Sequence, residues 1–408
     1  MNITVQYRAK KVDNSLSLLP IDEFIIIFVS KEFCLSTSKA ILVAMKNETE
    51  NIEKNNDKKR WIFAVTALEL AEILKNKGMK AYRAKQIMEW VFTKYQINPE
   101  KMSNLPKEFR KEIQNVVDFS LPPMIKQKIS HDKSATKFAF TFRENEAPVE
   151  SVLMFNRKRK PTLCVSSQIG CPFKCTFCST SSMGFIRNLS AAEIVFQVWF
   201  MRKELIRRDF NVSHNIVFMG MGEPLLNRDA LAESLDIFHD DSRFGISFRK
   251  MTISTAGVFD GIEWLADNYP QINLAVSVNT PVQKTRNEIM PSQIAAPIKR
   301  LIEIIRNHAA KTKRLPTIEY VLLKGVNTGR AHAISLCKLL EGLDCRVNLI
   351  PYNPADNSKL KAPEIAEQQF FLDILLENRV KATLRRSSGK DIGAGCGQLA
   401  TEIQQKQP

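Results

Sequence analysis

The chain has 408 residues, and its 59 lysines and arginines outnumber its 43 aspartates and glutamates, which gives a formal net charge of +16. Charged residues (25%) and hydrophobic residues (44%) occur in globular proportions, which excludes a largely disordered chain. At roughly 150 residues per domain, the length suggests two or three domains. The excess of base favours nucleic acid or an anionic membrane surface as a partner, although a generally basic proteome gives the same balance.

No apolar run approaches the roughly 20 residues of a membrane span. The strongest candidate, residues 24–29, lies between Glu23 and Lys31, and it lacks the cleavage site of a signal peptide. We therefore expect a cytoplasmic protein without a membrane partner. In a reducing compartment, the eight cysteines favour metal binding or catalysis over structural disulfides.

The N-terminal part, residues 1–60, does not read as a domain. Residues 46–60 are mostly Asn, Glu and Lys, which predicts a flexible extension. Met45 opens this polar stretch, and we hypothesise that it is an alternative start and that residues 1–44 are dispensable. A tryptic peptide from residues 1–44 of the native protein would disprove this.

Two further segments precede the main domain. Residues 61–125 have helical periodicity with Lys and Arg between the apolar positions, which predicts a basic helical module; a plain packing domain is the alternative. In residues 126–160, period-two alternation predicts strands at 137–142 and 150–155. The tetrad Arg157-Lys158-Arg159-Lys160 is expected at a hairpin tip, either solvated or in contact with phosphate.

From residue 161 to 402, strands and helices alternate. The predicted strands are 162–168, 215–220, 251–255, 273–279, 317–323, 347–352 and a weaker 382–385. The predicted helices are 191–207, 229–238, 259–268, 297–308, 331–340 and 364–378. Such alternation predicts an α/β domain with a parallel sheet, either open or closed into a partial or full barrel.

In such a sheet, functional groups gather where the strands end. Five predicted strand ends carry unusual loops, at 170–178, 220–224, 254–257, 277–281 and 351–354. We expect these loops to form one pocket.

The first of these loops holds Cys171, Cys175 and Cys178 in a C-x3-C-x2-C spacing. Structural zinc normally takes four protein ligands, and the nearest histidine, His214, lies a whole helix away. A 4Fe–4S cluster held by three cysteines leaves one iron open for a substrate or cofactor. The spacing favours such an open cluster; zinc or another metal, and plain packing, are the alternatives.

The aromatic Phe177 before the third cysteine makes this loop resemble the radical S-adenosylmethionine (SAM) superfamily. The runs GMGEPLLN (220–227), TLCVSSQ (162–168) and DIGAGCGQL (391–399) resemble the RlmN family, and the likeness covers roughly residues 65–402. Those enzymes methylate carbon 2 of an adenine in 23S rRNA and of one in tRNA. The resemblance implies a partial (β/α)6-type radical SAM barrel behind an N-terminal helical RNA-binding domain and a short β extension.

By this resemblance, Cys171, Cys175 and Cys178 hold one 4Fe–4S cluster with an open iron. Two SAM molecules are used per turnover, and an electron donor such as a flavodoxin-type reductant feeds the cluster of a monomeric enzyme. The implied SAM contacts are Gly222, Glu223, Ser254, Ser277, Val278, Asn279 and Asn353.

The resemblance also assigns three catalytic residues. A first SAM methylates Cys396, and a radical formed from the second SAM activates that methyl group, which adds to adenine and leaves a transient protein–RNA crosslink. Glu150 removes the proton from carbon 2. Cys164 then attacks the Cys396 sulfur and forms a disulfide that frees the product. Cys34, Cys337 and Cys345 match nothing and are taken as structural or incidental.

Two positions depart from the family pattern. Family members commonly have Ser-Leu-His-Ala-Pro where this chain has SVNTP (277–281), so Asn279 stands in place of a histidine. An amide replaces one hydrogen bond of an imidazole but does not titrate near neutral pH. Gly395 replaces a usual alanine, which is expected to loosen the loop beside Cys396.

Phosphate contacts are expected from residues 77–85, from the tetrad 157–160, and from Arg385, Arg386 and Lys390. Two other functions remain open. One is a methyltransferase for carbon 8 of the same rRNA adenine, which confers antibiotic resistance. The other is a non-catalytic RNA-binding protein with a structural metal.

Overall fold

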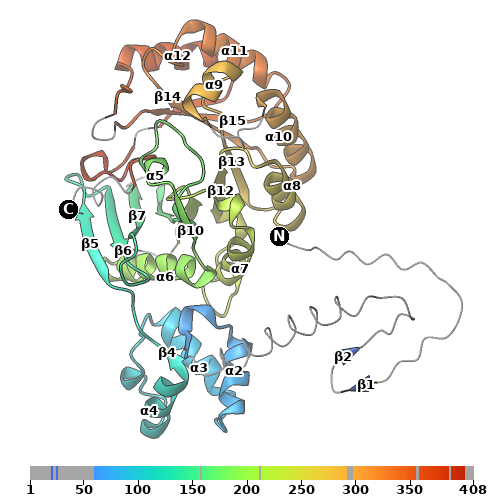
Figure 1. The fold of residues 1–408 in the computed structure, drawn as a ribbon. Helices are drawn as coiled ribbons and strands as arrows, with labels where there is room; N and C mark the ends of the chain where they lie inside the picture. Colours follow the sequence, from blue (N-terminus) through green and yellow to red (C-terminus); the bar gives the residue numbers. More distant parts are fainter. Residues whose placement is uncertain are drawn as a thin grey trace, which may run out of the picture. The chain divides into compact units, whose positions relative to one another are not determined.

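A ten-stranded sheet organises the fold (Figure 1). The computed structural model describes residues 20–21, 24–25, 59–156, 159–210, 213–291, 297–354, 358–385 and 387–399. Arg60–Pro408 form one unit and Met1–Lys59 another, in which β1 (Pro20–Ile21) and β2 (Phe24–Ile25) pair antiparallel. The hypotheses on Met45, Cys34, Arg157, Lys158 and Arg386 concern positions outside the described residues, and so do all of residues 1–44 except those of β1 and β2.

Seven strands of the sheet run parallel, as the strand–helix alternation predicted. They are β8 (Arg159–Cys164), β11 (Asn215–Phe218), β12 (Met251–Thr255), β13 (Asn273–Ser277), β14 (Thr317–Leu322), β15 (Arg346–Pro351) and β16 (Ala382–Leu384). They follow one another in chain order from β8 to β16. The sheet ends at β16, and in the described part of the chain β16 does not pair with β8, so the barrel is partial.

Three antiparallel strands extend this sheet beyond β8. They are β5 (Met124–Ile129), β6 (Ala135–Phe140) and β7 (Val149–Asn156), in the order β8-β7-β6-β5. The pair Asn156 and Arg159 joins β7 to β8, which confirms the predicted hairpin. On β6, Phe138 and Phe140 pack against Phe200 of α6 (Ala191–Arg207), so the alternate residues Lys137 and Ala139 point to the opposite face.

Helices cover the outside of the parallel sheet (Figure 1). They are α6 (Ala191–Arg207), α7 (Arg228–His239), α8 (Phe259–Asn268), α10 (Ile298–Thr312), α11 (Arg330–Leu340) and α12 (Ile365–Glu377). Ser190 and Glu193 form the predicted capping box at the start of α6. Two short helices, α5 (Ser179–Ser182) and α9 (Gln283–Ile289), were not predicted, because each is too short to show an amphipathic repeat.

The segment after β8 differs from the expectation of one strand over 162–168. Strand β8 ends at Cys164, and β9 (Gln168–Gly170) pairs instead with β10 (Phe185–Asn188) in a separate antiparallel hairpin. Gly170 permits this pairing, because its φ is +71° and an added Cβ would lie 1.7 Å from the carbonyl oxygen of Gly184. The cysteine loop therefore belongs to a hairpin outside the main sheet.

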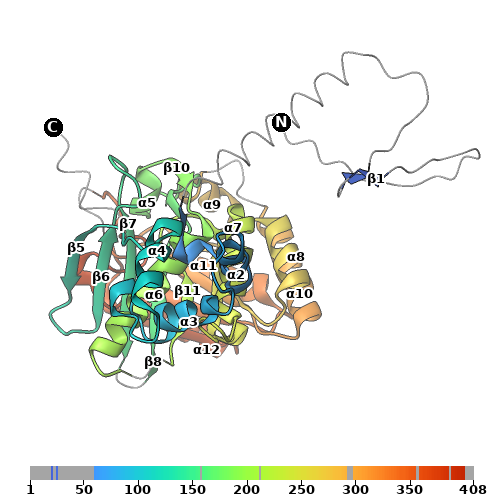
Figure 2. The same cartoon turned by 90° about the horizontal axis from the view of Figure 1, so that it is seen from below.

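The helical module begins at Arg60 and packs on α6 (Figure 2). Its elements are β3 (Arg60–Trp61), η1 (Ile62–Ala64), α2 (Ala67–Asn76), α3 (Arg83–Met88), η2 (Glu89–Thr93), η3 (Pro99–Lys101), α4 (Lys107–Val116) and β4 (Val117–Asp118). The Phe63 ring lies 5.2 Å from that of Trp199, whose indole N–H donates to the Val91 carbonyl over 2.7 Å. Buried aromatic packing thus joins the module to the barrel.

Three short 3-10 helices complete the described structure: η4 (Pro224–Leu226), η5 (Phe248–Lys250) and η6 (Lys390–Ile392). None of the described helices is long and apolar enough to cross a membrane.

Candidate active site

A cavity with an empty volume of about 1050 Å³ lies at the carboxyl ends of the parallel strands. All five loops singled out in the sequence contribute to its wall, together with the C-terminal segment. Its lining includes Cys171, Cys175, Cys178, Gly222, Glu223, Ser254, Ser277, Asn279, Asn353 and Cys396. The expectation of a single pocket is confirmed, because parallel strands bring their carboxyl ends to the same edge.

The three clustered cysteines lie in the loop between β9 and β10, and all are half-buried. Burial, together with the charges of Cys178 and Glu223, raises the pKa of the Cys171 thiol to about 12, and burial also raises the pKa of Cys175. Buried thiolates therefore need a positive partner. Within the described residues, no three His, Cys, Asp or Glu side chains converge on a single ion. Three cysteines are one ligand short of a structural zinc site, whereas this donor set suits a 4Fe–4S cluster in which each thiolate binds its own iron and one iron stays open.

Glu223 is a fixed acceptor at the end of β11. Its side chain is buried, and its two oxygens accept hydrogen bonds from the N–H groups of Ala256 (2.8 Å) and Leu225 (3.2 Å). Burial raises the pKa of this carboxyl to about 7, against the opposing effect of those hydrogen bonds. The carboxylate has four lone-pair sites, so it keeps acceptor capacity toward the cavity. Gly222 beside it has φ +97°, and an added Cβ would lie 2.5 Å from the Cβ of Gln168.

The residues of the loop after β13 differ in whether they face the cavity or the core. Ser277 and Asn279 line the cavity, whereas the Val278 side chain is buried in the core. The Asn279 backbone is left-handed (φ 60°), a conformation that Asn tolerates. Its Oδ1 accepts from the Val321 N–H over 2.9 Å and its Nδ2 lies 3.4 Å from the Met290 sulfur. The amide that replaces the usual imidazole therefore ties this loop to β14.

Arg286 on α9 is a buried residue that the sequence reasoning missed. Its guanidinium donates to the carbonyls of Ser277 (3.0 Å), Val278 (2.5 Å) and Ala256 (2.7 Å), and no carboxylate pairs with it among the described residues. Burial lowers its pKa to about 10, and the nearby Cys175 opposes that shift. A positive charge thus lies behind the cysteine loop. No motif in the sequence marks Arg286, and its helix α9 was not predicted, so nothing in the sequence pointed to this residue.

Asn353 after β15 has an unused acceptor. The side chain is buried, and its Nδ2 donates to the Ser387 hydroxyl over 3.0 Å. Its Oδ1 is buried and has no hydrogen-bond partner in the described structure. A buried carbonyl of this kind is costly unless a donor reaches it, so the cavity wall fits a ligand that carries hydroxyl or amino groups.

A second cavity lies inside the curve of the sheet and adjoins the first. It has an empty volume of about 1880 Å³, and Cys164 and Cys396 both line it. Cys396 also lines the first cavity. The Cys164 side chain is buried among apolar residues that include Ala394 and Leu399 of the C-terminal segment. Two thiols that are far apart in the sequence therefore share one chamber.

The two thiols share an electrostatic environment. Burial raises the pKa of Cys164 to about 12, the nearby Cys396 adds to this, and Arg385 opposes it. The Cys396 side chain is accessible from the cavities yet enclosed by protein, and this burial raises its pKa, again against Arg385. Arg385 also lies 4.0 Å from Glu319, whose Oε2 is buried without a partner among the described residues. Arg385 is thus the charge that favours both thiolates.

Glu150 is buried (2% exposed), although its place in a strand alone suggests a surface carboxylate. It faces Ala139 across the β6–β7 pair, and the Lys137 ammonium lies 3.1 Å from its Oε1. The same ammonium donates to the carbonyl of Gly393 over 3.2 Å. The C-terminal loop is held further by the Ser179 N–H, which donates to the Gly397 carbonyl over 2.7 Å.

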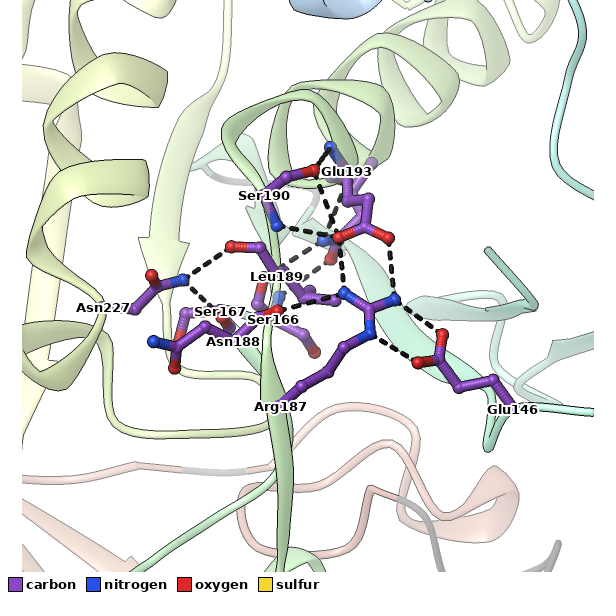
Figure 3. A network of polar contacts seen from close by, with 10 residues as sticks. Glu146, Ser166, Ser167, Arg187, Asn188, Leu189, Ser190, Glu193 and Asn227 are labelled. Atoms are coloured by element: carbon purple, nitrogen blue, oxygen red, sulfur yellow. Dashed lines mark hydrogen bonds and ion pairs between the residues drawn. The ribbon is translucent and has the colours of Figure 1, made fainter. Parts of the chain in front are cut away.

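A polar network fixes the hairpin that carries the cysteines (Figure 3). Arg187 on β10 binds both oxygens of Glu193 at 2.8 Å each, and it also pairs with Glu146 in the β6–β7 loop. The Asn227 amide donates to the carbonyls of Ser167 (2.9 Å) and Leu189 (2.8 Å). The hairpin is therefore anchored to the first turn of α6 and to the β extension.

Comparison with known proteins agrees with this geometry. Residues 165–336 match the family model of the radical SAM superfamily, and residues 62–118 match that of the ribosomal RNA large subunit methyltransferase N-terminal domain. The chain is 38% identical to the dual-specificity RNA methyltransferase RlmN of Vesicomyosocius okutanii, over 81% of this chain and 92% of that protein. It is 39% identical to the protein of the same name from Lawsonia intracellularis, over 79% and 91% of the two chains.

One solved structure is similar over most of the chain. It is a radical SAM methyltransferase from Sphaerobacter thermophilus, with a TM-score of 0.80 and 36% sequence identity. The likeness covers 84% of this chain and all of that one. The partial barrel and the helical module therefore occur together in another protein.

Proposed function

The chain belongs to the RlmN family of radical SAM RNA methyltransferases, and from this premise we propose that it methylates carbon 2 of an adenine in 23S rRNA and in tRNA. The observation that carries the proposal is the position of Cys396, which lines both the cavity of the three clustered cysteines and the chamber that contains Cys164. A methyl carrier needs access to both places.

The first cavity would hold the cofactors. Cys171, Cys175 and Cys178 would bind a 4Fe–4S cluster, and their buried thiols fit that role. The SAM ligands would be Gly222, Glu223, Ser254, Ser277, Asn279 and Asn353, with the free Oδ1 of Asn353 as one acceptor. Val278, whose N–H and C=O are both bonded within the protein, would shape the loop. When bound, cluster and SAM supply the one-electron chemistry that carbon 2 needs, because this carbon is not nucleophilic.

The chain's own residues would then act in order. The Cys396 sulfur would carry the methyl carbon to carbon 2 of adenine, where a C–C bond forms. One hydrogen atom of that methyl group and one electron of the adduct would pass to the bound cofactors, and the Glu150 carboxylate would accept the proton from carbon 2. The Cys164 thiolate attacks the Cys396 sulfur, and the new S–S bond forms as the S–C bond breaks. The electron pair of the S–C bond stays with the carbon, which takes up a proton to become the methyl group. Arg385 favours both thiolates by its charge.

The RNA would be held by the basic parts of the chain. In this proposal residues 1–60 are an extension, 61–125 bind RNA, 126–160 are linker strands, and 161–402 form the barrel with the methyl-carrier loop. Lys77, Lys80 and Lys85 are exposed on the helical module, and Arg385 lines the chamber of Cys164. An adenine must leave its stack to enter that chamber. We further propose a monomer that works in the cytoplasm with a flavodoxin-type reductant.

Product analysis tests the proposal. The anaerobically reconstituted enzyme is incubated with SAM, a reductant and 23S rRNA or tRNA, and the digested nucleosides are identified by mass spectrometry. We expect 2-methyladenosine from both RNAs and none from Cys396→Ser. If the product is 8-methyladenosine, the site of methylation is carbon 8 and not carbon 2. If the protein is brown and cleaves SAM but forms no methylated adenosine, the proposal is wrong.

A further inference from the structure

Lys137 on β6 is a buried lysine with 4% of its side chain exposed. Its ammonium lies 3.1 Å from Oε1 of Glu150 and donates to the carbonyl of Gly393 over 3.2 Å. Gly393 is the C-cap of η6 and lies three positions before Cys396. One ammonium group therefore contacts the strand that carries the proposed proton acceptor and the loop that carries the proposed methyl carrier.

The strand pattern explains how a lysine reaches this place. Phe138 and Phe140 take the face of β6 that packs on α6, so Lys137 lies on the other face with Ala135 and Ala139. The two alanines leave room there for the C-terminal segment, and Ala135 packs in the same apolar cluster as Ile392 and Ala394. Lys137 thus points into a layer formed by β6, β7 and the segment 389–399.

Such burial has a cost that the contacts must offset. A lysine is almost never fully buried unless it is paired, because its charge loses solvation. Simple packing on this face would be met by an apolar side chain of similar length. The charge is instead placed between the carboxylate of Glu150 and a backbone carbonyl of the loop that carries Cys396, and the proposed chemistry requires Glu150 and Cys396 to keep a fixed relative position.

We propose that Lys137 is a positioning residue that holds the Glu150 carboxylate and the Cys396 loop in a single arrangement. The inference rests on the proposed function, in which Glu150 accepts the proton and Cys396 carries the methyl group. Loss of the ammonium leaves Glu150 without this counter-charge and releases Gly393. The loop stays attached through Gly397 and through Asp391, whose carboxylate accepts from the His131 N–H over 2.8 Å.

The first experiment measures how accessible Cys396 is in its loop, and it does not depend on enzyme activity. Alkylation of Cys396 by iodoacetamide in the cluster-free protein is followed by peptide mass spectrometry. We expect Lys137→Met to react several-fold faster at Cys396, with Lys137→Arg and the exposed control Lys126→Met close to the wild type. An unchanged rate in Lys137→Met removes the contact between Lys137 and the loop from the proposal.

The second experiment tests whether Lys137 acts through Glu150. In single-turnover reactions with RNA deuterated at carbon 2 of the target adenine, we expect Lys137→Met to slow product formation by about 10- to 100-fold and to raise the deuterium isotope effect. The double variant Lys137→Met/Glu150→Gln is expected to be no slower than Glu150→Gln. If the two losses multiply, Lys137 acts independently of Glu150 and the proposal is wrong.

These outcomes are separable from those for the proposed function. Wild-type protein that forms no methylated adenosine contradicts the function, whereas a wild type and a Lys137→Met variant of equal rate contradict only the role of Lys137. The double variant also removes the negative charge of Glu150, so it provides a folded comparison if Lys137→Met alone does not fold. Recovery of rate in Lys137→Arg is expected, because Arg also donates to a carboxylate and a carbonyl.

Discussion

Cys164 and Cys396 line the same chamber inside the sheet, although 232 positions separate them in the sequence. In the proposed reaction, Cys164 releases the product from Cys396. Cys164→Ala should therefore form the crosslink but fail to resolve it, so that a covalent protein–RNA adduct accumulates on denaturing gels. Cys396→Ala should form neither adduct nor methylated RNA. If Cys164→Ala turns over freely without an adduct, its resolving role is wrong.

A side chain added at Gly395 would have to displace the ends of two neighbouring side chains. An added Cβ would lie 2.7 Å from both the Asn353 Nδ2 and the Gln398 Oε1. Gly395→Ala should therefore displace Asn353 and lower the free energy of unfolding by about 1–3 kcal/mol, with weaker SAM binding. Gly329→Ala, where the nearest atom is 3.8 Å away, is the control. Equal melting temperatures and SAM affinities for the two variants would contradict this expectation.

Arg187 pairs with both Glu146 and Glu193 and is largely buried (15% of its side chain exposed). Hydrogen bonds to the two carboxylates raise its pKa against the effect of burial, so it stays charged. Arg187→Ala leaves two buried carboxylates without this partner and should cost about 3–5 kcal/mol of unfolding free energy. Arg207→Ala, which breaks an exposed pair with Glu204, should cost at most about 1 kcal/mol. Urea unfolding measures the stability of both variants. Similar losses of unfolding free energy in Arg187→Ala and Arg207→Ala would be evidence against the anchoring role of Arg187.

His308 on α10 is buried, and neither ring nitrogen has a hydrogen-bond partner among the described residues. Burial, helped by the charge of Arg314, lowers its pKa to about 4 from the usual 6.5. Between pH 6.5 and 4 the unfolded chain binds a proton that the folded chain does not, so stability falls as the pH falls, by up to about 1.4 kcal/mol per pH unit. His308→Met should flatten this slope in urea unfolding at pH 7, 6 and 5. If the wild type and His308→Met show the same dependence of stability on pH, other titrating groups cause that dependence.

Lys77, Lys80 and Lys85 are exposed on the helical module. If they bind phosphates, their joint replacement by alanine should weaken RNA binding and reduce the slope of log affinity against log salt by up to about 3. The control replaces Lys299, Lys311 and Lys338 by alanine. These lysines are exposed on α10 and α11, and their replacement removes the same amount of charge. Filter binding at several salt concentrations distinguishes a specific contact from general charge, since the latter predicts equal slopes for both variants.

Local patterns were enough to locate most of the barrel. The bounds of α6, α8 and β12 agree with the sequence prediction residue for residue, because hydrophobic periodicity and the Ser190 cap report on each element alone. The break between β8 and β9 was not predicted. It depends on the close approach of Gly170 to Gly184 across the β9–β10 hairpin, and such an approach leaves no mark on the apolar pattern.

The candidate site divides in the same way. The spacing of Cys171, Cys175 and Cys178 and the strand–helix alternation are local properties, so the sequence alone singled out the cysteine loop and the edge of the sheet where it lies. The pairing of Lys137 with Glu150, the burial of Arg286 behind Cys175 and the meeting of Cys164 with Cys396 follow from strand register and from the docking of the C-terminal loop. Those contacts join residues distant in sequence, so only the tertiary structure could define them.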